Sequence, residues 1–155
     1  MPTIIVLVLA NDGGGYDKMV QSVRDTWGSQ VLDNIKIYYC YGHRENIWRQ
    51  SETYAIEDCI YSDVPESRFN IYEKTMRSFK WLLENETFDY VYRCNCGSYV
   101  DLNNLNAFIE DKPLEHFYSG FVGTVSRHVG LAPGIERLPT YFWERSPISY
   151  ASGSG

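Results

Sequence analysis

The sequence predicts a single α/β domain over residues 1–155, in which a mostly parallel central sheet is flanked by helices. The chain of 155 residues is long enough for one domain with a sizeable core. Continuous β-branched stretches, of which residues 4–9 are the clearest, are typical of strands covered on both faces. These stretches alternate with segments of helical periodicity, and that order indicates an α/β sheet.

The first half of the chain begins with a buried strand at residues 4–9. This strand ends in the glycine-rich loop 11–15, which matches neither the dinucleotide fingerprint nor a P-loop. Apolar residues at helical spacing then predict a helix over residues 17–27. The remaining elements predicted for this half are a strand at 35–41, a helical or irregular segment at 46–58, a short strand at 59–61 and a turn at 62–65.

The clearest predicted helix of the chain spans residues 70–85. Its apolar face is expected to consist of Ile71, Thr75, Phe79, Leu82 and Leu83. The elements predicted after it are a strand at 88–93, a helix that Asp101 caps at its N-terminus, a strand at 117–125 and an aromatic, turn-rich tail at 138–155.

Charge and hydropathy narrow the possible partners. The formal net charge of −6 argues against nucleic acid or an anionic membrane surface, because both require a basic face. No run approaches the roughly 20 apolar residues of a membrane span. The four cysteines show no paired spacing, so free thiols in a reducing cytoplasm are expected.

The chain is rich in aromatic residues, with 13 Tyr and 4 Trp. Most such rings are expected to line the core or a groove, and the alternative is that some stack on sugars or bases.

The stretch 88–105 is the candidate site, because a strand there ends in polar and small residues. Ligands of open α/β sheets bind where strands end. Arg93, Asn95 and Gly97 lie at this strand end, together with Cys94 and Cys96. Two cysteines alone are too few for a tetrahedral zinc site.

Four segments, in order, resemble the β-1,3-galactosyltransferase and Fringe-like family of glycosyltransferases. Residues 24–27 (RDTW) resemble its R-x-T-W, and residues 66–75 (ESRFNIYEKT) resemble its D-S-Y-x-N-L-T-x-K-T. Residues 118–120 (YSG) resemble its Y-x-G, and residues 146–153 (SPISYASG) resemble its Y-P-x-Y-x-S-G. The resemblance implies a GT-A fold and an inverting transfer of sugar from a nucleotide-sugar, a UDP-sugar foremost, to a glycan or glycoprotein acceptor.

The chain departs from this family where an acidic triplet would hold a divalent cation. Asn95, Cys96 and Gly97 stand at those positions, and Mn²⁺ and Mg²⁺ prefer carboxylate oxygens. The sequence therefore indicates no definite cofactor, and binding of Mn²⁺ or Mg²⁺ at this position is disfavoured. Three readings stay open: a metal-independent transferase, a weak metal site that recruits Asp101, and a non-catalytic module that binds a nucleotide-sugar or carbohydrate.

The resemblance also predicts which residues contact the nucleotide-sugar. The loops after the first two strands are expected near the base, three cations near the diphosphate, and the triplet beneath the donor sugar. In that order the residues are Leu9, Ala10, Asn11 and Gly42; Arg24, Lys74 and Arg93; and Asn95, Cys96 and Gly97.

The catalytic base is not predicted. In the family a carboxylate after the S-G segment takes the acceptor proton, whereas this sequence stops at Gly155, so a fragment of a longer protein is expected. Asp101, Asp111, Glu115 and Glu144 remain as substitutes. A cytoplasmic enzyme of microbial or viral origin fits the lack of a signal segment in this sequence.

Overall fold

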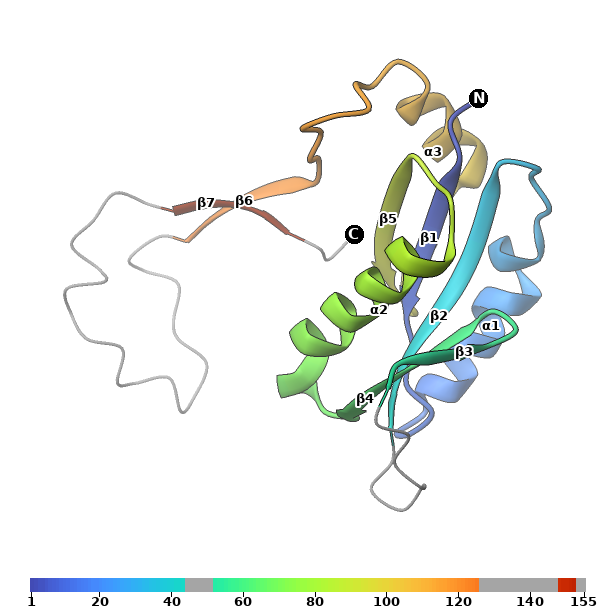
Figure 1. Cartoon of the computed structure of the whole chain (residues 1–155), viewed down its shortest axis with the longest axis vertical. Coiled ribbons are helices and arrows are strands. Elements are labelled where there is room, and N and C mark those ends of the chain that lie inside the picture. The colour runs from blue at the N-terminus through green and yellow to red at the C-terminus, as the bar shows by residue number, and fades with distance from the viewer. Residues whose placement is uncertain (44–51, 126–147, 153–155) are drawn as a thin grey trace. The chain divides into compact units, whose positions relative to one another are not determined.

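A computed structural model describes the chain except for residues 44–51, 126–147 and 153–155 (Figure 1). The chain divides into two compact units, Met1–Phe117 and Tyr118–Gly155, and each is described by itself. The first unit is an α/β structure, in which helices flank a five-stranded sheet.

The sheet of the first unit has the strand order β3-β4-β2-β1-β5. Strand β1 is buried along its whole length and pairs in parallel with β2 on one side and β5 on the other. β4 pairs in parallel with β2, and β3 pairs antiparallel with β4. The strands are β1 (Ile4–Leu9), β2 (Ile35–His43), β3 (Tyr54–Ile56), β4 (Cys59–Pro65) and β5 (Tyr90–Asn95).

The sheet is mixed, which corrects the prediction of a mostly parallel sheet. The difference is β3, which lies in the segment 46–58 that was predicted to be helical or irregular. Two residues, Glu57 and Asp58, join β3 to β4, and Glu57 has a φ of 53°. Two-residue hairpin connections favour positive φ values, and such a short hairpin leaves little periodicity in the sequence.

The turn predicted at residues 62–65 is wrong, because β4 continues through this segment to Pro65. Alternate residues Ile60, Ser62 and Val64 are buried, which is the period of two expected of a strand. The buried Ser62 hydroxyl lies 3.3 Å from the Ser78 hydroxyl, so its polar group is satisfied inside the protein. A polar residue in a short stretch ending in proline had suggested a turn instead.

The helices cover opposite faces of the sheet (Figure 1). α1 (Tyr16–Asp25), η1 (Trp27–Ser29) and α3 (Leu102–Ile109) pack against the face that carries the Val6 and Val8 side chains. α2 (Ile71–Asn85), which follows η2 (Arg68–Asn70), packs against the face that carries Leu7 and Leu9. Successive side chains of β1 point to opposite faces of the sheet, so β1 contributes to the core on both sides.

Asp101 caps α3, which confirms the sequence prediction. Its carboxylate accepts hydrogen bonds from the backbone N–H groups of Asn103 and Asn104 at 3.1 and 3.0 Å. The Asn104 side-chain amide donates a third bond at 2.8 Å. An N-cap carboxylate satisfies backbone donors that have no partner within the helix.

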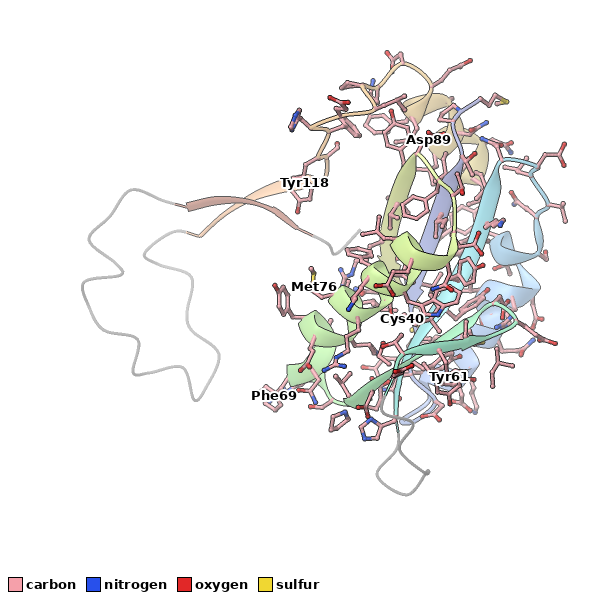
Figure 2. The ribbon with its side chains drawn as sticks, in the orientation of Figure 1. Cys40, Tyr61, Phe69, Met76, Asp89 and Tyr118 are labelled. Atoms are coloured by element: carbon pink, nitrogen blue, oxygen red, sulfur yellow. The ribbon has the colours of Figure 1, made fainter. Side chains whose placement is uncertain are left out.

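The buried face of α2 differs from the predicted one. Lys74, Ser78 and Leu82 are its buried residues, and their spacing of four places them on one side of the helix. Leu83 was predicted to line the core, but it is 72% exposed. Phe69 and Met76 also project outward from this part of the chain (Figure 2). The sheet covers one face of α2, and apolar residues also lie on the exposed side of the helix. Hydrophobicity alone therefore does not identify the buried face.

The second unit contains an antiparallel pair of strands, β6 (Phe121–Val125) and β7 (Ile148–Ser152). β6 confirms the later part of the strand predicted at 117–125. β7 lies in the tail that was predicted to be turn-rich, and much of that tail lies outside the described residues. Across the described part of the chain, helices fall short of the length and apolarity that spanning a bilayer would need.

Leu82 is fully buried against the sheet, whereas the next residue, Leu83, faces solvent. We expect Leu82→Ala to lower the free energy of unfolding by about 2–5 kcal/mol, because it leaves a cavity beneath α2. The matched control Leu83→Ala should change it by no more than about 0.5 kcal/mol. Urea denaturation of the two variants measures the difference, and equal losses would contradict this packing.

Candidate functional site

Three neighbouring strands bring most of the predicted site residues to one edge of the sheet. β2, β1 and β5 are adjacent and parallel, so their carboxyl ends meet there. Leu9 pairs with Asn95, and the Leu9 carbonyl accepts a hydrogen bond from the Cys96 N–H at 3.2 Å. On the other side, the Ala10 N–H donates to the Cys40 carbonyl at 3.0 Å.

Lys74 reaches this edge from α2 and is buried, with 3% of its surface exposed. Its Nζ donates to the Ala10 carbonyl at 2.9 Å and to Glu66 Oε1 at 2.8 Å. Glu66 is a functional candidate that the sequence analysis missed. The signal was available, because Glu66 is the first residue of the segment 66–75 that resembles the glycosyltransferase motif, and Lys74 lies in the same segment.

Glu66 also binds the backbone of β2. Its Oε2 accepts a hydrogen bond from the Gly42 N–H at 2.6 Å. A Cβ atom at position 42 would lie 2.8 Å from the Val64 carbonyl oxygen and 3.0 Å from Glu66 Oε2. Glycine is therefore needed here for close approach, which is a physical reason for its place in the predicted site.

Arg93 and Asn95 lie on the α2 face of the sheet. Their partners in β1 are Leu7 and Leu9, which pack against α2. Arg93 is also close enough to influence the Cys40 thiol, which lies between the sheet and α2 (Figure 2). Burial raises the pKa of Cys40 to about 11, while the hydrogen bond from Ser78 and the charges of Lys74 and Arg93 act to lower it.

Arg24 is not brought to Lys74 and Arg93, which corrects the expectation of three cations around a diphosphate. Arg24 donates to both carboxylate oxygens of Asp58 at 2.6 and 2.8 Å. Its guanidinium lies 3.9 Å from the centroid of the Tyr39 ring, which belongs to the α1 face of the sheet. The hydrogen bonds from Arg24 hold the pKa of Asp58 below its usual range.

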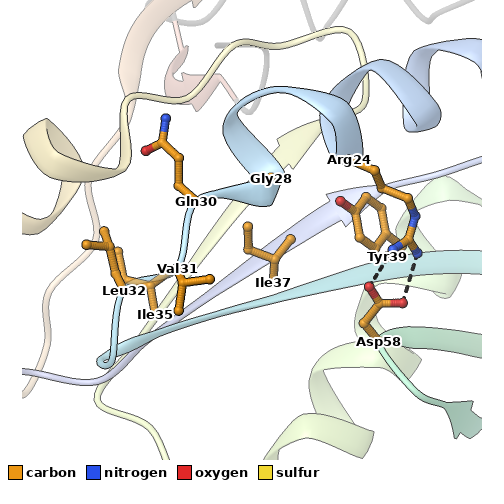
Figure 3. A pocket seen from close by; sticks show the side chains of 9 residues that line it. All are labelled: Arg24, Gly28, Gln30, Val31, Leu32, Ile35, Ile37, Tyr39 and Asp58. Carbon is orange, nitrogen blue, oxygen red and sulfur yellow. Dashed lines mark hydrogen bonds and ion pairs between the residues drawn. The ribbon is translucent and has the colours of Figure 1, made fainter.

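The Arg24–Asp58 pair lies at one end of a pocket of about 280 Å³ on the α1 face (Figure 3). Gly28 lines the pocket, and a Cβ atom there would lie 2.6 Å from the Val23 carbonyl oxygen. Because the guanidinium is held by Asp58, this pocket offers an apolar wall and a paired charge, not a free anion-binding site. The apolar wall consists of Val31, Leu32, Ile35 and Ile37.

The residues at the positions of the acidic triplet do not fit a hard divalent cation. Asn95 supplies one neutral oxygen, and burial raises the pKa of the Cys96 thiol, which favours its protonated form. The Asp101 carboxylate is occupied in capping α3. No group of three or more His, Cys, Asp or Glu side chains gathers as a metal site within the residues that the structure describes.

The chain matches no family model, no curated protein and no solved structure. The resemblance to the glycosyltransferases therefore remains a prediction.

The structure does give the RDTW segment a packing role. Trp27 is buried, and its Nε1 donates to the Ser98 carbonyl at 3.1 Å, which ties η1 to the loop after β5.

The Arg24–Asp58 pair predicts a pH dependence of stability. Because the pKa of folded Asp58 is lowered, the pair stabilises the protein above the ordinary Asp pKa of about 4. That contribution, about 0.5–1 kcal/mol for a half-exposed pair, should be lost as the pH falls through the folded pKa. Urea denaturation between pH 7 and 2 should show a flatter profile for Asp58→Asn. The exposed Asp25→Asn should keep the wild-type profile.

The contacts of Gly42 predict that Gly42→Ala is destabilising. Its Cβ must displace either the Val64 carbonyl or the Glu66 carboxylate, and such overpacking costs about 1–3 kcal/mol. Gly97→Ala is the control, since its Cβ would meet only the flexible Met19 side chain, at 3.9 Å. Thermal unfolding of both variants measures the cost, and a neutral Gly42→Ala would contradict this close approach.

Proposed function

We propose that this chain is a glycosyltransferase of GT-A type, which moves a sugar from a UDP-sugar to a glycan or glycoprotein acceptor. The observation that carries the proposal is the convergence at one sheet edge. The ends of β1, β2 and β5 meet there, and the Lys74 side chain joins the first two. Strand ends of this kind are where α/β sheets bind nucleotides.

The parts of the donor are assigned to different strands. The loop after β1, with Ala10 and Asn11, and the end of β2, with Gly42, would hold the nucleoside. Arg93 on β5 would face the diphosphate, and Asn95 would lie beneath the sugar. Arginine suits this role because its guanidinium binds phosphate oxygens through two parallel hydrogen bonds.

The proposed reaction is a direct displacement with inversion. The acceptor oxygen forms a bond to the anomeric carbon as the bond from that carbon to the diphosphate oxygen breaks, and the acceptor proton passes to a base. Asp101 is a poor candidate for that base, because its carboxylate already accepts three hydrogen bonds. Glu144 lies outside the described residues.

The proposed transferase works without a divalent cation. The donor set of Asn95, Cys96 and Gly97 does not suit Mn²⁺ or Mg²⁺. In its place, Arg93 would stabilise the charge that develops on the departing diphosphate, which fixed cations do effectively in an ordered site.

A second candidate function is a binding module for a nucleotide-sugar or carbohydrate that performs no transfer. It is favoured by the pairing of Lys74 with Glu66, because a neutralised cation contributes less to a leaving diphosphate. It uses the same strand-end site and differs only in turnover.

Calorimetric titration with UDP, with and without Mn²⁺, tests the proposal. We expect UDP to bind in the absence of Mn²⁺ with an affinity that the metal changes little. A strong dependence on Mn²⁺ would contradict the metal-independent form, and no binding of UDP or any UDP-sugar would overturn the proposed function. Hydrolysis of a UDP-sugar then separates the transferase from the binding module, since only the enzyme should cleave it.

A further inference from the structure

The buried pair of Lys74 and Glu66 joins main-chain groups from separate parts of the fold. Lys74 binds the carbonyl of Ala10 after β1, and Glu66 binds the N–H of Gly42 in β2. The two side chains meet at 2.8 Å, with side-chain exposures of 4% and 12%. One ion pair therefore fixes the distance between the ends of two neighbouring strands.

The backbone of Lys74 is held as firmly as its side chain. The hydroxyl oxygens of Ser62 on β4 and Ser78 on α2 lie 3.3 and 3.0 Å from its carbonyl oxygen, within hydrogen-bonding distance. The Cys40 thiol of β2 lies 3.8 Å from the same oxygen. The Ala10 carbonyl is therefore bonded to a side chain whose own backbone is in contact with β4, α2 and β2.

Stability alone is a weak reason for such a pair. Removing two charges from water carries a large desolvation penalty, and neutral side chains of similar volume are often as stable or more so. A pair that bonds to the backbone just after β1 and near the end of β2 is better suited to fixing the positions of these two segments. Preorganised binding segments strengthen binding because less freedom is lost when the ligand binds.

We propose that Lys74 and Glu66 are positioning residues, which hold Ala10 and Gly42 in the arrangement that accepts the nucleoside half of the donor. This inference rests on the proposed function, since it concerns the same strand-end site. It assigns Lys74 to the nucleoside half through Ala10 and leaves the diphosphate to Arg93. Loss of the pair should therefore lower the affinities for uridine and for UDP by the same factor.

The test uses the full chain with the double variant Lys74→Met and Glu66→Gln, titrated with uridine and with UDP. The double variant leaves no unpaired buried charge, so we expect it to fold. Affinity for both ligands should fall about tenfold, because the Ala10 carbonyl loses its anchor. Arg93→Ala should lower the affinity for UDP and leave the affinity for uridine unchanged. Wild-type affinity in the double variant would overturn the inference.

A matched control is the exposed pair of Lys80 and Glu84 on the same helix, whose charged atoms are 3.8 Å apart. Lys80→Met with Glu84→Gln removes the same charges and should leave both affinities unchanged. An equal loss in this control would overturn the positioning role, because the effect would then come from charge at a distance.

Amide hydrogen exchange on the wild-type protein decides the question if the double variant does not fold. Saturation with uridine should slow exchange at the Gly42 N–H, which bonds to Glu66. Unchanged exchange there would overturn the inference even though uridine binds. If the wild-type protein binds neither UDP nor uridine, the proposed function and the positioning role both fail. If the wild-type protein binds both ligands and the double variant binds them equally well, the positioning role alone fails.

Discussion

A buried ammonium group must find partners inside the protein, and that constraint organises the carboxyl edge of the sheet. The Lys74 ammonium donates hydrogen bonds to the Glu66 carboxylate and to the Ala10 backbone carbonyl. Glu66 in turn needs donors, and it finds the second one in the Gly42 N–H. Since an unpaired charge at this depth would be strongly destabilising, the ends of β1 and β2 and the start of α2 must keep their places together.

The two faces of the sheet carry different chemistry at this edge. On the α2 face, Lys74 pairs with Glu66, and the charges of Lys74, Glu66 and Arg93 all act on the Cys40 thiol. On the α1 face, Arg24 lies over the Tyr39 ring and binds Asp58 beside an apolar pocket. Arg24 is thus separated from Lys74 and Arg93 by the thickness of the sheet. On the α2 face, the Lys74 ammonium bonds to the Ala10 carbonyl after β1 and to Glu66, which bonds to the Gly42 N–H of β2.

The same alternation divides the residues at the end of β5. Asn95 pairs with Leu9 on the α2 side, whereas Cys96 packs into the core on the α1 side. Neighbouring residues that point to opposite faces cannot easily converge on one ion. The lack of acidic residues at Asn95, Cys96 and Gly97 and the divergent packing of Asn95 and Cys96 both disfavour a divalent cation at this strand end.

Local signals were sufficient for the elements that depend on neighbours in the sequence. The continuous apolar run of β1, the helical period of α2 and the Asp101 cap were all predicted, because periodicity and capping involve residues within about four positions. Grouping Leu83 with the core face failed, because the sheet and not the helix decides which side of an apolar helix is covered.

The sequence by itself therefore determined an α/β fold and the segments whose ends form the candidate site. The tertiary structure decided what those residues contact. Lys74 bonds to Ala10 across 64 positions, and Arg24 bonds to Asp58 across 34. Such partners follow from strand order and from the face on which each side chain lies, and neither is encoded in the spacing of a single segment. That is why the three cations predicted to meet at one diphosphate are divided between the faces, with Arg24 on the α1 face and Lys74 and Arg93 on the α2 face.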